Sequence, residues 1–143
     1  MAFLETFNTS NYEYRNGGMM GDPFNSLEIK NGLLEIVHFG GSNSKWYLTD
    51  KYRYQHKEFE LIGVFNWSGD PCDYWEVIDY NISTCKIIYS YEEEDCDTDE
   101  AKIIKSKKET FYYKLKKKPL LQNRTEGNTK IFSPKYKVEM LVL

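Results

Sequence analysis

The stretch Lys45-Trp46-Tyr47-Leu48-Thr49-Asp50-Lys51-Tyr52-Arg53-Tyr54-Gln55 decides the fold, because its side chains alternate in character. One set of alternate positions is mostly large and apolar, with Asp50 as the exception: Trp46, Leu48, Tyr52 and Tyr54. The other set is mostly polar: Lys45, Tyr47, Thr49, Lys51 and Arg53. A period of two residues predicts a β-strand with one buried face and one solvated face.

The segments around this stretch predict antiparallel hairpins. Asn31-Gly32 suits a type I′ turn, because both central residues of that turn need positive φ, and His56-Lys57 is a candidate for a second two-residue turn. In the strand expected over Glu58–Trp67, Gly63 indicates a bulge or the close approach of a neighbour. We expect one cluster of side chains to pack across the adjacent strands: Trp46, Leu48, Phe59, Leu61 and Phe65.

The rest of the chain continues this composition of aromatic and β-branched residues. Further strands are expected over residues 74–82, 85–91, 102–106, 110–115 and 136–143, with a turn at 68–71 and a loop over 122–129. No long segment has a helical period, and a short helix near Phe3–Phe7 is the sole candidate. The sequence therefore predicts a mostly β single domain over residues 1–143, an antiparallel curved sheet or β-sandwich with little helix.

Composition narrows the class of protein. The chain has 143 residues and a net charge of −3, and none of its apolar runs approaches the roughly 20 residues of a membrane-spanning helix. The three cysteines, Cys72, Cys85 and Cys96, are odd in number and form no C-x-x-C pair, so we expect reduced thiols. Because the first residues lack a secretory signal pattern, we expect a cytoplasmic protein; the alternative is an exported protein whose signal is absent from this sequence.

The sequence shows no motif of reaction chemistry. His38 lies in an apolar strand and His56 in an expected turn, and no serine or cysteine carries an activating motif. The acidic stretch after Asp95 lacks the glycine and final glutamate of a calcium loop, and the segment 40–44 lacks the end of a phosphate-binding loop. We therefore expect no catalytic residue, no metal and no cofactor.

Charge is more informative, because it is divided along the chain. Residues 92–100 include seven acidic and no basic residues, whereas residues 102–118 include eight lysines and one acid, Glu109. The acidic run reads either as a mobile loop or as a docking surface for a basic partner. Lysines that protect the edge of a sheet explain this basic stretch at least as well as a nucleic-acid-binding surface does. The net negative charge of the chain disfavours nucleic acid as the partner.

Two sets of residues are the candidates for partner binding. The first is the acidic run: Glu92, Glu93, Glu94, Asp95, Asp97, Asp99 and Glu100. The second is the solvated strand face around Tyr47 and Arg53, because aromatic residues and arginine commonly anchor interfaces.

Several motifs together resemble a known family. They are GGMMGDPFNSLEIKNG (residues 17–32), HFGGSN (38–43), Lys45-Trp46, YRYQ (52–55), FELIG (59–63) and Asp79-Tyr80-Asn81 with Thr84. This pattern, over residues 17–86, resembles small bacterial β-rich proteins of unassigned function that often occur in the C-terminal part of exported proteins. Cys85 stands where that family tends to have glycine. The resemblance implies a β fold unit and no catalytic assignment.

These observations favour a non-enzymatic protein-binding domain. The specific hypothesis is a bacterial immunity protein that binds and neutralises a partner toxin, such as a basic toxin domain, because acidic groups can mimic phosphate at the active site of a nucleic-acid-cutting toxin. The alternative is an exported or envelope-associated β domain that binds carbohydrate or cell-envelope material through exposed Trp and Tyr. An enzyme that uses His38 or His56 is a third class, and the sequence leaves the oligomeric state open.

Overall fold

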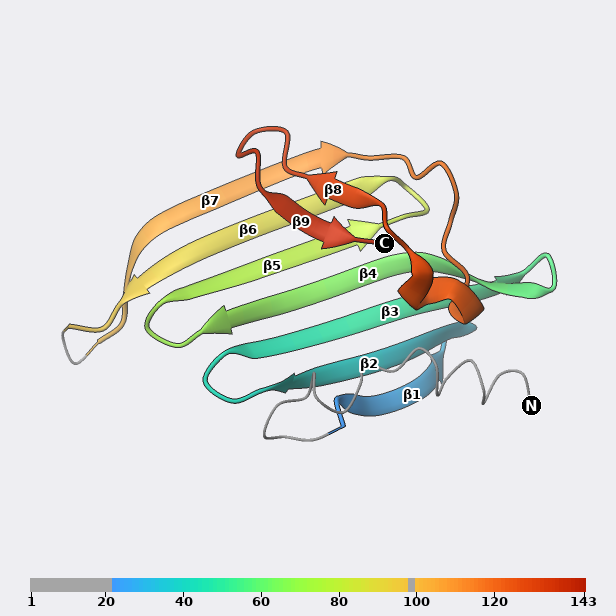
Figure 1. The fold of residues 1–143 in the computed structure, drawn as a ribbon, viewed down its shortest axis with the longest axis horizontal. Helices are drawn as coiled ribbons and strands as arrows, with labels where there is room; N and C mark the ends of the chain where they lie inside the picture. Colours follow the sequence, from blue (N-terminus) through green and yellow to red (C-terminus); the bar gives the residue numbers. More distant parts are fainter. Residues whose placement is uncertain (1–21, 98–99) are drawn as a thin grey trace.

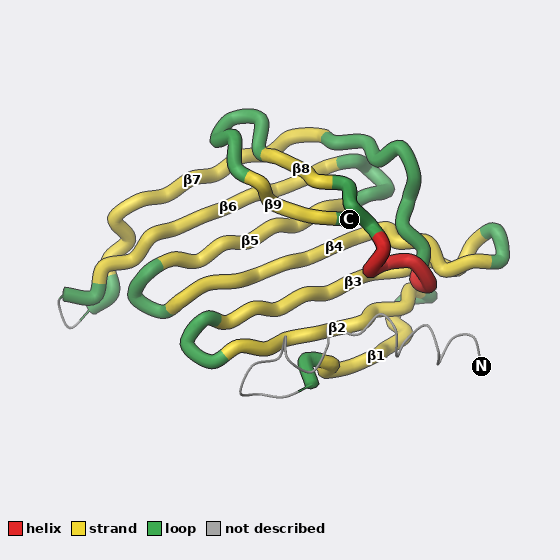
Figure 2. Tube along the Cα trace, in the orientation of Figure 1, coloured by secondary structure: helices red, strands yellow, loops and turns green. Residues whose placement is uncertain are grey.

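The computed structural model describes residues 22–97 and 100–143 and contains one seven-stranded antiparallel sheet, whose strands follow one another in chain order (Figure 1). The strands of this sheet are β1 (Phe24–Lys30), β2 (Leu33–Gly41), β3 (Lys45–Gln55), β4 (Glu58–Asp70), β5 (Tyr74–Asn81), β6 (Lys86–Asp95) and β7 (Lys102–Tyr112). A short 3-10 helix, η2 (Leu121–Glu126), and the hairpin of β8 (Lys130–Phe132) and β9 (Glu139–Val142) come after it (Figure 2). The predicted mostly β, antiparallel fold is confirmed, as one sheet with a small hairpin. The helix expected near Phe3–Phe7 lies outside the described residues.

The two predicted two-residue turns are confirmed. Asn31 and Gly32 have φ of 51° and 74°, and His56 and Lys57 have φ of 53° and 63°. Positive φ at both central residues gives the turn the twist that an antiparallel pair of strands needs. Strand β3 has the predicted bounds, Lys45–Gln55.

The C-terminal segment, residues 113–143, packs on one face of the sheet, which we call the core face (Figure 1). It starts beside the β5–β6 turn, where the Tyr113 N–H donates to the Cys85 carbonyl at 2.8 Å, and it reaches β4 where the Leu61 N–H donates to the Pro119 carbonyl at 2.9 Å. Buried apolar side chains from both layers then form a single cluster, which includes Leu48, Tyr52, Leu61, Ile78, Tyr80, Ile87 and Tyr89 of the sheet and Leu121, Ile131, Met140 and Leu141 of the segment. The sheet therefore buries Leu48 and Tyr52 and half-buries Trp46, as the pattern of β3 predicts. The expectation that Tyr54 is buried with them is wrong, because this residue lies at the end of the strand and is exposed.

Asp50, the exception in that pattern, is explained by an ion pair with Arg124. Its carboxylate lies on the core face, accepts from Arg124 Nε at 2.7 Å and Nη2 at 3.3 Å, and also accepts from the Tyr52 hydroxyl at 3.2 Å. The side chains of Asp50 and Arg124 are only 7% and 12% exposed. A buried carboxylate is tolerated because the guanidinium and the hydroxyl replace its water.

Of the two alternatives predicted at Gly63, a bulge or the close approach of a neighbour, the structure has the bulge, which changes the face of the residues after it. Gly63 pairs with Lys51 and Leu61 with Tyr52, so Ile62 is the extra residue. One extra residue reverses the alternation, and Phe65 lies on the face opposite Leu61. The expectation that Phe65 packs with Leu61 and Leu48 is therefore wrong; its ring meets Tyr47 edge-on at 6.2 Å.

Other segments differ from the predictions at their ends. Residues 68–70 continue β4, because they pair with β5, and the turn falls at 71–73. The two strands expected over 102–115 are one strand, β7, and the loop expected over 122–129 begins with η2. The strand expected over 136–143 is limited to β9, since Lys137 has φ of 59° in the turn before it.

No helical segment in the described residues has the length and hydropathy of a membrane span.

Replacing Arg124 with methionine should destabilise the protein, because it leaves the Asp50 carboxylate buried without its cation. The expected loss is about 3–5 kcal/mol in the free energy of unfolding, measured by denaturant titration. The double variant Asp50→Leu/Arg124→Met should recover most of this loss, because it removes the buried charge as well. A fully stable Arg124→Met variant would show that the pair does not hold the C-terminal segment in place.

Cys85, at the end of the β5–β6 turn, has a φ of 63°. Its backbone is held on both sides, because its N–H donates to the Ile82 carbonyl at 3.3 Å and its carbonyl accepts from the Tyr113 N–H at 2.8 Å. The left-handed conformation disfavours a residue with a Cβ. This conformation gives a physical reason for glycine at the position where the resembled family tends to have it.

Replacing Cys85 with glycine should therefore stabilise the protein by about 1 kcal/mol, measured as a shift of the denaturation midpoint. The matched control is Cys85→Ala, which removes the thiol but keeps the Cβ and should give no such gain. Equal midpoints for the two variants would contradict the backbone explanation.

Candidate functional site

The opposite face of the sheet, which we call the groove face, carries no packed element in the part of the chain that the structure describes. Every described strand and helix belongs either to the seven-stranded sheet or to the segment on its core face. Cross-strand pairing orders the groove face of β2 to β5 in rows. One row joins Val37, Thr49, Phe65 and Asp79, and the next joins Glu35, Lys51, Gly63 and Asn81.

A hollow of about 660 Å³ lies mainly over these two rows. Its lining comes from β2 to β5 and the turn after β5: Leu33, Glu35, Tyr47, Thr49, Lys51, Arg53, Ile62, Gly63, Val64, Phe65, Asp79, Tyr80, Asn81 and Ser83. The volume falls within the range of ligand-binding sites. Because the described residues leave this face open and the lining mixes charged, polar and aromatic side chains, the hollow suits a segment of a larger partner better than an enclosed small molecule.

Gly63 is the reason for a depression at this place. It lies between Lys51 and Asn81 in the pairing and contributes no side chain to the face. A Cβ built on Gly63 would lie 3.7 Å from both Lys51 Cβ and the Tyr80 carbonyl oxygen, which is ordinary contact. The missing side chain of Gly63 therefore leaves the space above the strand, although the backbone there would accept a Cβ without a clash. A larger side chain would fill the hollow.

A row of aromatic rings borders the hollow. Tyr47 pairs across the strands with Phe39 on one side and Trp67 on the other, and Trp67 stacks on Trp75 with ring centroids 4.9 Å apart. Gly69 opposite Trp75 makes room for that indole, since a Cβ there would lie 2.5 Å from Trp75 Cε3. Rigid aromatic surface next to polar groups is typical of the centre of a protein interface.

The charges of the hollow are of both signs. Lys51 Nζ lies 3.6 Å from the Glu35 carboxylate, which neutralises both groups. Arg53 and Asp79 are exposed, and neither side chain forms an ion pair or hydrogen bond within residues 22–97 and 100–143. The hollow therefore offers one cation and one anion to a partner.

Tyr47 and Arg53, the second predicted candidate surface, thus lie together in this hollow. The alternation of β3 was sufficient to place them on the solvated face. Glu35, Lys51, Asp79 and Asn81 complete the site, and none of them was predicted from the sequence. Asp79 and Asn81 alternate within a predicted strand, but the register that sets this strand beside Gly63 depends on the bulge.

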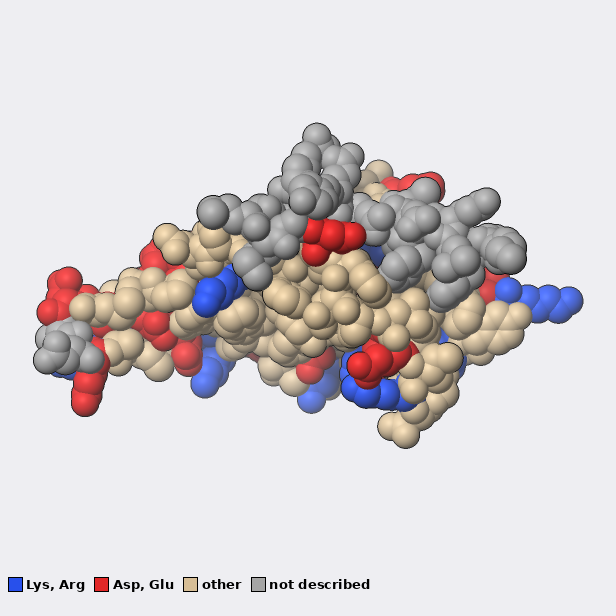
Figure 3. Space-filling view, turned by 90° about the horizontal axis from the view of Figure 1, so that it is seen from below, with Lys and Arg blue, Asp and Glu red and all other residues tan. Residues whose placement is uncertain are grey.

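The acidic run, the first predicted surface, lies at the far end of the β6–β7 hairpin, where red atoms gather at the left of the molecule (Figure 3). Its first part is not a loop: residues 92–95 belong to β6, because they pair with β5 and β7. The Glu93 carboxylate accepts from Lys105 Nζ at 2.9 Å and from the Tyr91 hydroxyl at 3.0 Å. Hydrogen bonding by Lys105, chiefly, lowers the pKa of Glu93.

The acidic run divides between the two faces of the sheet. Glu92 pairs with Trp75 on the groove face, whereas Glu93 pairs with Tyr74 on the core face. Glu94 and Asp95 lie past the end of the ladder with β5 but still pair with β7, opposite Ile103 and Lys102. The Asp97 N–H donates to Asp95 Oδ1 at 3.0 Å. Glu100 is exposed, and Asp99 lies outside the described residues. The structure does not bring this run together with Tyr47 and Arg53.

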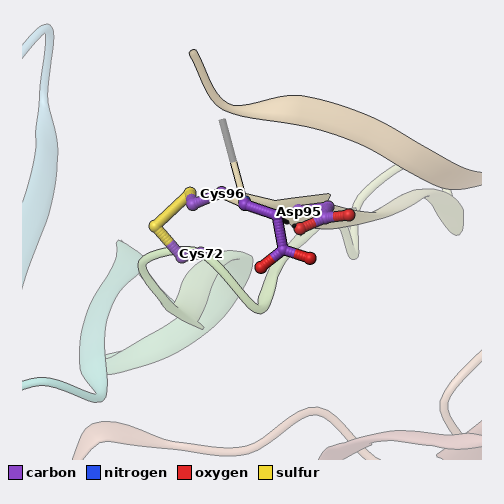
Figure 4. Close-up of a disulfide and its surroundings, with 4 residues drawn as sticks. Cys72, Asp95 and Cys96 are labelled. Atoms are coloured by element: carbon purple, nitrogen blue, oxygen red, sulfur yellow. Dashed lines mark hydrogen bonds between the residues drawn. A yellow bond between two sulfur atoms is a disulfide. The ribbon is translucent and has the colours of Figure 1, made fainter. Parts of the chain in front are cut away.

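A disulfide between Cys72 and Cys96 holds this end of the sheet (Figure 4). It joins the β4–β5 turn to the residue after β6, and the Glu94 N–H donates to the Asp73 carbonyl at 2.8 Å beside it. The expectation of three reduced thiols is therefore wrong. The two cysteines are 24 residues apart in sequence. They meet because β5 and β6 are antiparallel and in the register that pairs Tyr74 with Glu93, which places the residues just outside these two positions next to each other.

We call the acidic groups of this end the acidic tip. They include Asp70 at the end of β4 and Asp73 in the β4–β5 turn, besides the acidic run itself: Glu92, Glu93, Glu94, Asp95, Asp97 and Glu100. The disulfide and the ladder hold Asp70, Asp73 and residues 92–95 close to one another. This part of the tip therefore forms a defined negative pole.

The histidines lie away from the hollow. His38 is buried on the core face, and burial, above all, lowers its pKa. His56 lies in the β3–β4 turn, where its Nδ1 is 2.9 Å from Glu60 Oε1, and this hydrogen bond is the chief cause of a lowered pKa of Glu60. Among the described residues, no group of three His, Cys, Asp or Glu side chains could hold a metal ion. The hollow offers donors, acceptors and aromatic surface, which are the chemistry of binding.

No family model, no curated protein and no solved structure matches this chain. The resemblance described for residues 17–86 stays an expectation.

The disulfide predicts the outcome of thiol alkylation. Without reductant, a single thiol, that of Cys85, should be modified under denaturing conditions and detected by mass spectrometry. Reduction should expose two more thiols and lower the free energy of unfolding by about 3 kcal/mol, because the open chain gains the entropy that closing this loop removed. Three modified thiols without reductant would contradict the bridge.

Proposed function

We propose that this chain is a non-enzymatic protein-binding domain that recognises its partner through the groove face of β2 to β5. The observation that supports this most is the hollow itself, which places Tyr47 and Arg53 beside Asp79 on a sheet face that the described chain leaves open. Aromatic residues and arginine dominate the energetic centres of protein interfaces. The stacked indoles of Trp67 and Trp75 extend the same surface.

In its specific form the proposed partner is a toxin, and the chain is an immunity protein that neutralises it. The acidic tip supports this form, because a pole of fixed carboxylates attracts the basic surface of a nucleic-acid-cutting enzyme. The tip and the groove lie along the same strands: Asp79 in the hollow and Trp75 opposite Glu92 are both on β5. One partner of ordinary interface size could contact both.

A second candidate function is an exported β domain that binds carbohydrate or other envelope material. The disulfide between Cys72 and Cys96 favours this candidate over a cytoplasmic one, because such bonds persist in oxidising compartments. The aromatic row of Tyr47, Trp67 and Trp75 would then supply stacking surfaces for sugar rings.

Photo-crosslinking from the hollow separates these functions. A benzophenone amino acid replaces Tyr47 in the full chain, and the source cells are irradiated after expression. We expect one specific protein to be crosslinked, because Tyr47 lines the hollow, and to be identified by mass spectrometry.

The matched control carries the same amino acid at Thr110, an exposed position on β7 outside the hollow, and should not crosslink that protein. Combining Gly63→Val with the benzophenone in place of Tyr47 should reduce the crosslink, because the new side chain fills the hollow without a backbone clash. A crosslink that appears equally at Thr110, or that Gly63→Val leaves unchanged, would remove the hollow from the interface.

A further inference from the structure

We infer that the hollow of the groove face binds an extended peptide segment of the partner that presents one acidic and one basic side chain, the acidic one at Arg53 and the basic one at Asp79. This inference rests on the proposed function, and it names the chemistry of the segment that the hollow recognises.

Arg53 forms one end of the site. It is the last charged residue of β3 on this face before the hairpin, it lines the hollow, and it is exposed. Its side chain forms no ion pair within residues 22–97 and 100–143, and Lys51, its neighbour on the same face, is already paired with Glu35. The planar guanidinium therefore remains available for a carboxylate, which it binds with two parallel hydrogen bonds.

Asp79 forms the other end. It lies on β5 in the row of Phe65 and Thr49, is exposed, and likewise has no ion-pair partner in the described chain. Its neighbour on the groove face, Asn81, adds an amide that donates and accepts hydrogen bonds. An ammonium or guanidinium group of the partner satisfies this carboxylate.

The positions of the two charges favour an extended segment. Arg53 and the row of Asp79 are separated by two strand spacings, about 10 Å, and by four residues along the strands, about 13 Å. The diagonal distance between the two charged residues is therefore about 16 Å. Charged residues four apart in an extended peptide lie about 13 Å apart, and the length of their side chains covers the difference. Between the ends lies the row of Lys51, Gly63 and Asn81, where Gly63 leaves room for a backbone. Phe65, beside Asp79, and Tyr47, one row further, offer apolar surface next to the basic side chain of the segment.

The balance of charge separates this site from the acidic tip. With Glu35 and Lys51 paired, the described residues leave the hollow one unpaired charge of each sign, so its net charge does not select a uniformly basic or uniformly acidic ligand. The hollow instead distinguishes ligands by whether they place an acidic group at Arg53 and a basic group at Asp79, because a group of the same charge at either position is repelled.

The test uses four blocked nine-residue peptides of threonine and valine that differ only at the third and seventh positions: Glu and Lys, Glu and Glu, Lys and Lys, or Gln and Gln. Each is titrated into the isotope-labelled full chain, and amide NMR shifts are followed. We expect the Glu and Lys peptide to shift the amides of Lys51, Gly63 and Asn81. It should bind about fivefold more tightly than the Gln and Gln peptide, because two exposed charge pairs contribute that much.

Charge reversal supplies the decisive comparison. Arg53→Glu should make the Lys and Lys peptide the tightest ligand, and Asp79→Lys should make the Glu and Glu peptide the tightest, because each variant gives the hollow two like charges. The matched control is Lys108→Glu, an exposed charge on the groove face of β7 outside the hollow, which should leave the order of affinities unchanged.

Three results would overturn the inference: an order of affinities that neither reversal changes, shifts confined to the acidic tip, or no shift in the hollow with any peptide at millimolar concentration. A soluble chitin hexasaccharide is titrated in parallel, and shifts of the hollow with the saccharide alone would assign the site to carbohydrate instead. If the inference fails while the crosslink from Tyr47 persists, the hollow binds a protein by other contacts. Loss of that crosslink would reject the proposed function itself.

Discussion

The buried ion pair between Asp50 and Arg124 sets the arrangement on which the rest of the structure depends. A single antiparallel sheet has two faces, and it needs one covered face to form a core. The pair joins the centre of β3 to η2, at the start of the C-terminal segment that supplies the cover. Because a charge cannot be buried without its partner, Asp50 and Arg124 together restrict which face is covered and where the segment begins to cover it.

Local chemistry accounts for the features that the sequence predicted well. The bounds of β3 and the turns at Asn31-Gly32 and His56-Lys57 depend on residues close together in the chain, and the structure has all three. The partner of Asp50 is 74 residues away, and the partner of Cys72 is 24 residues away. Such contacts depend on sheet register and on the return path of the chain, which alternation within one strand does not contain.

The candidate site shows the same division. Tyr47 and Arg53 were placed on the solvated face by the alternation of β3, and they do lie there together. The bulge at Gly63 was predicted, but its effect on the later residues of β4 was not: the extra residue moves Phe65 to the groove face and sets Asp79 beside it. The acidic run was visible in the sequence, but its pairing in β6 and its bridge to the β4–β5 turn were not.

The two poles of the molecule differ in how their charges can act. The acidic tip concentrates carboxylates of one sign, so its field extends to about the Debye length, roughly 10 Å at 0.1 M salt, and acts mainly on the rate of encounter. The hollow is balanced, so its charges cancel at that distance and act only when a partner's groups touch Arg53 or Asp79. Along β5, four residues separate Asp79 from Trp75 beside the tip, about 13 Å. A partner attracted to the tip therefore arrives within one interface width of the hollow. How long it stays bound then depends on contacts with the matched charges and the aromatic row, because attraction at a distance affects the rate of encounter.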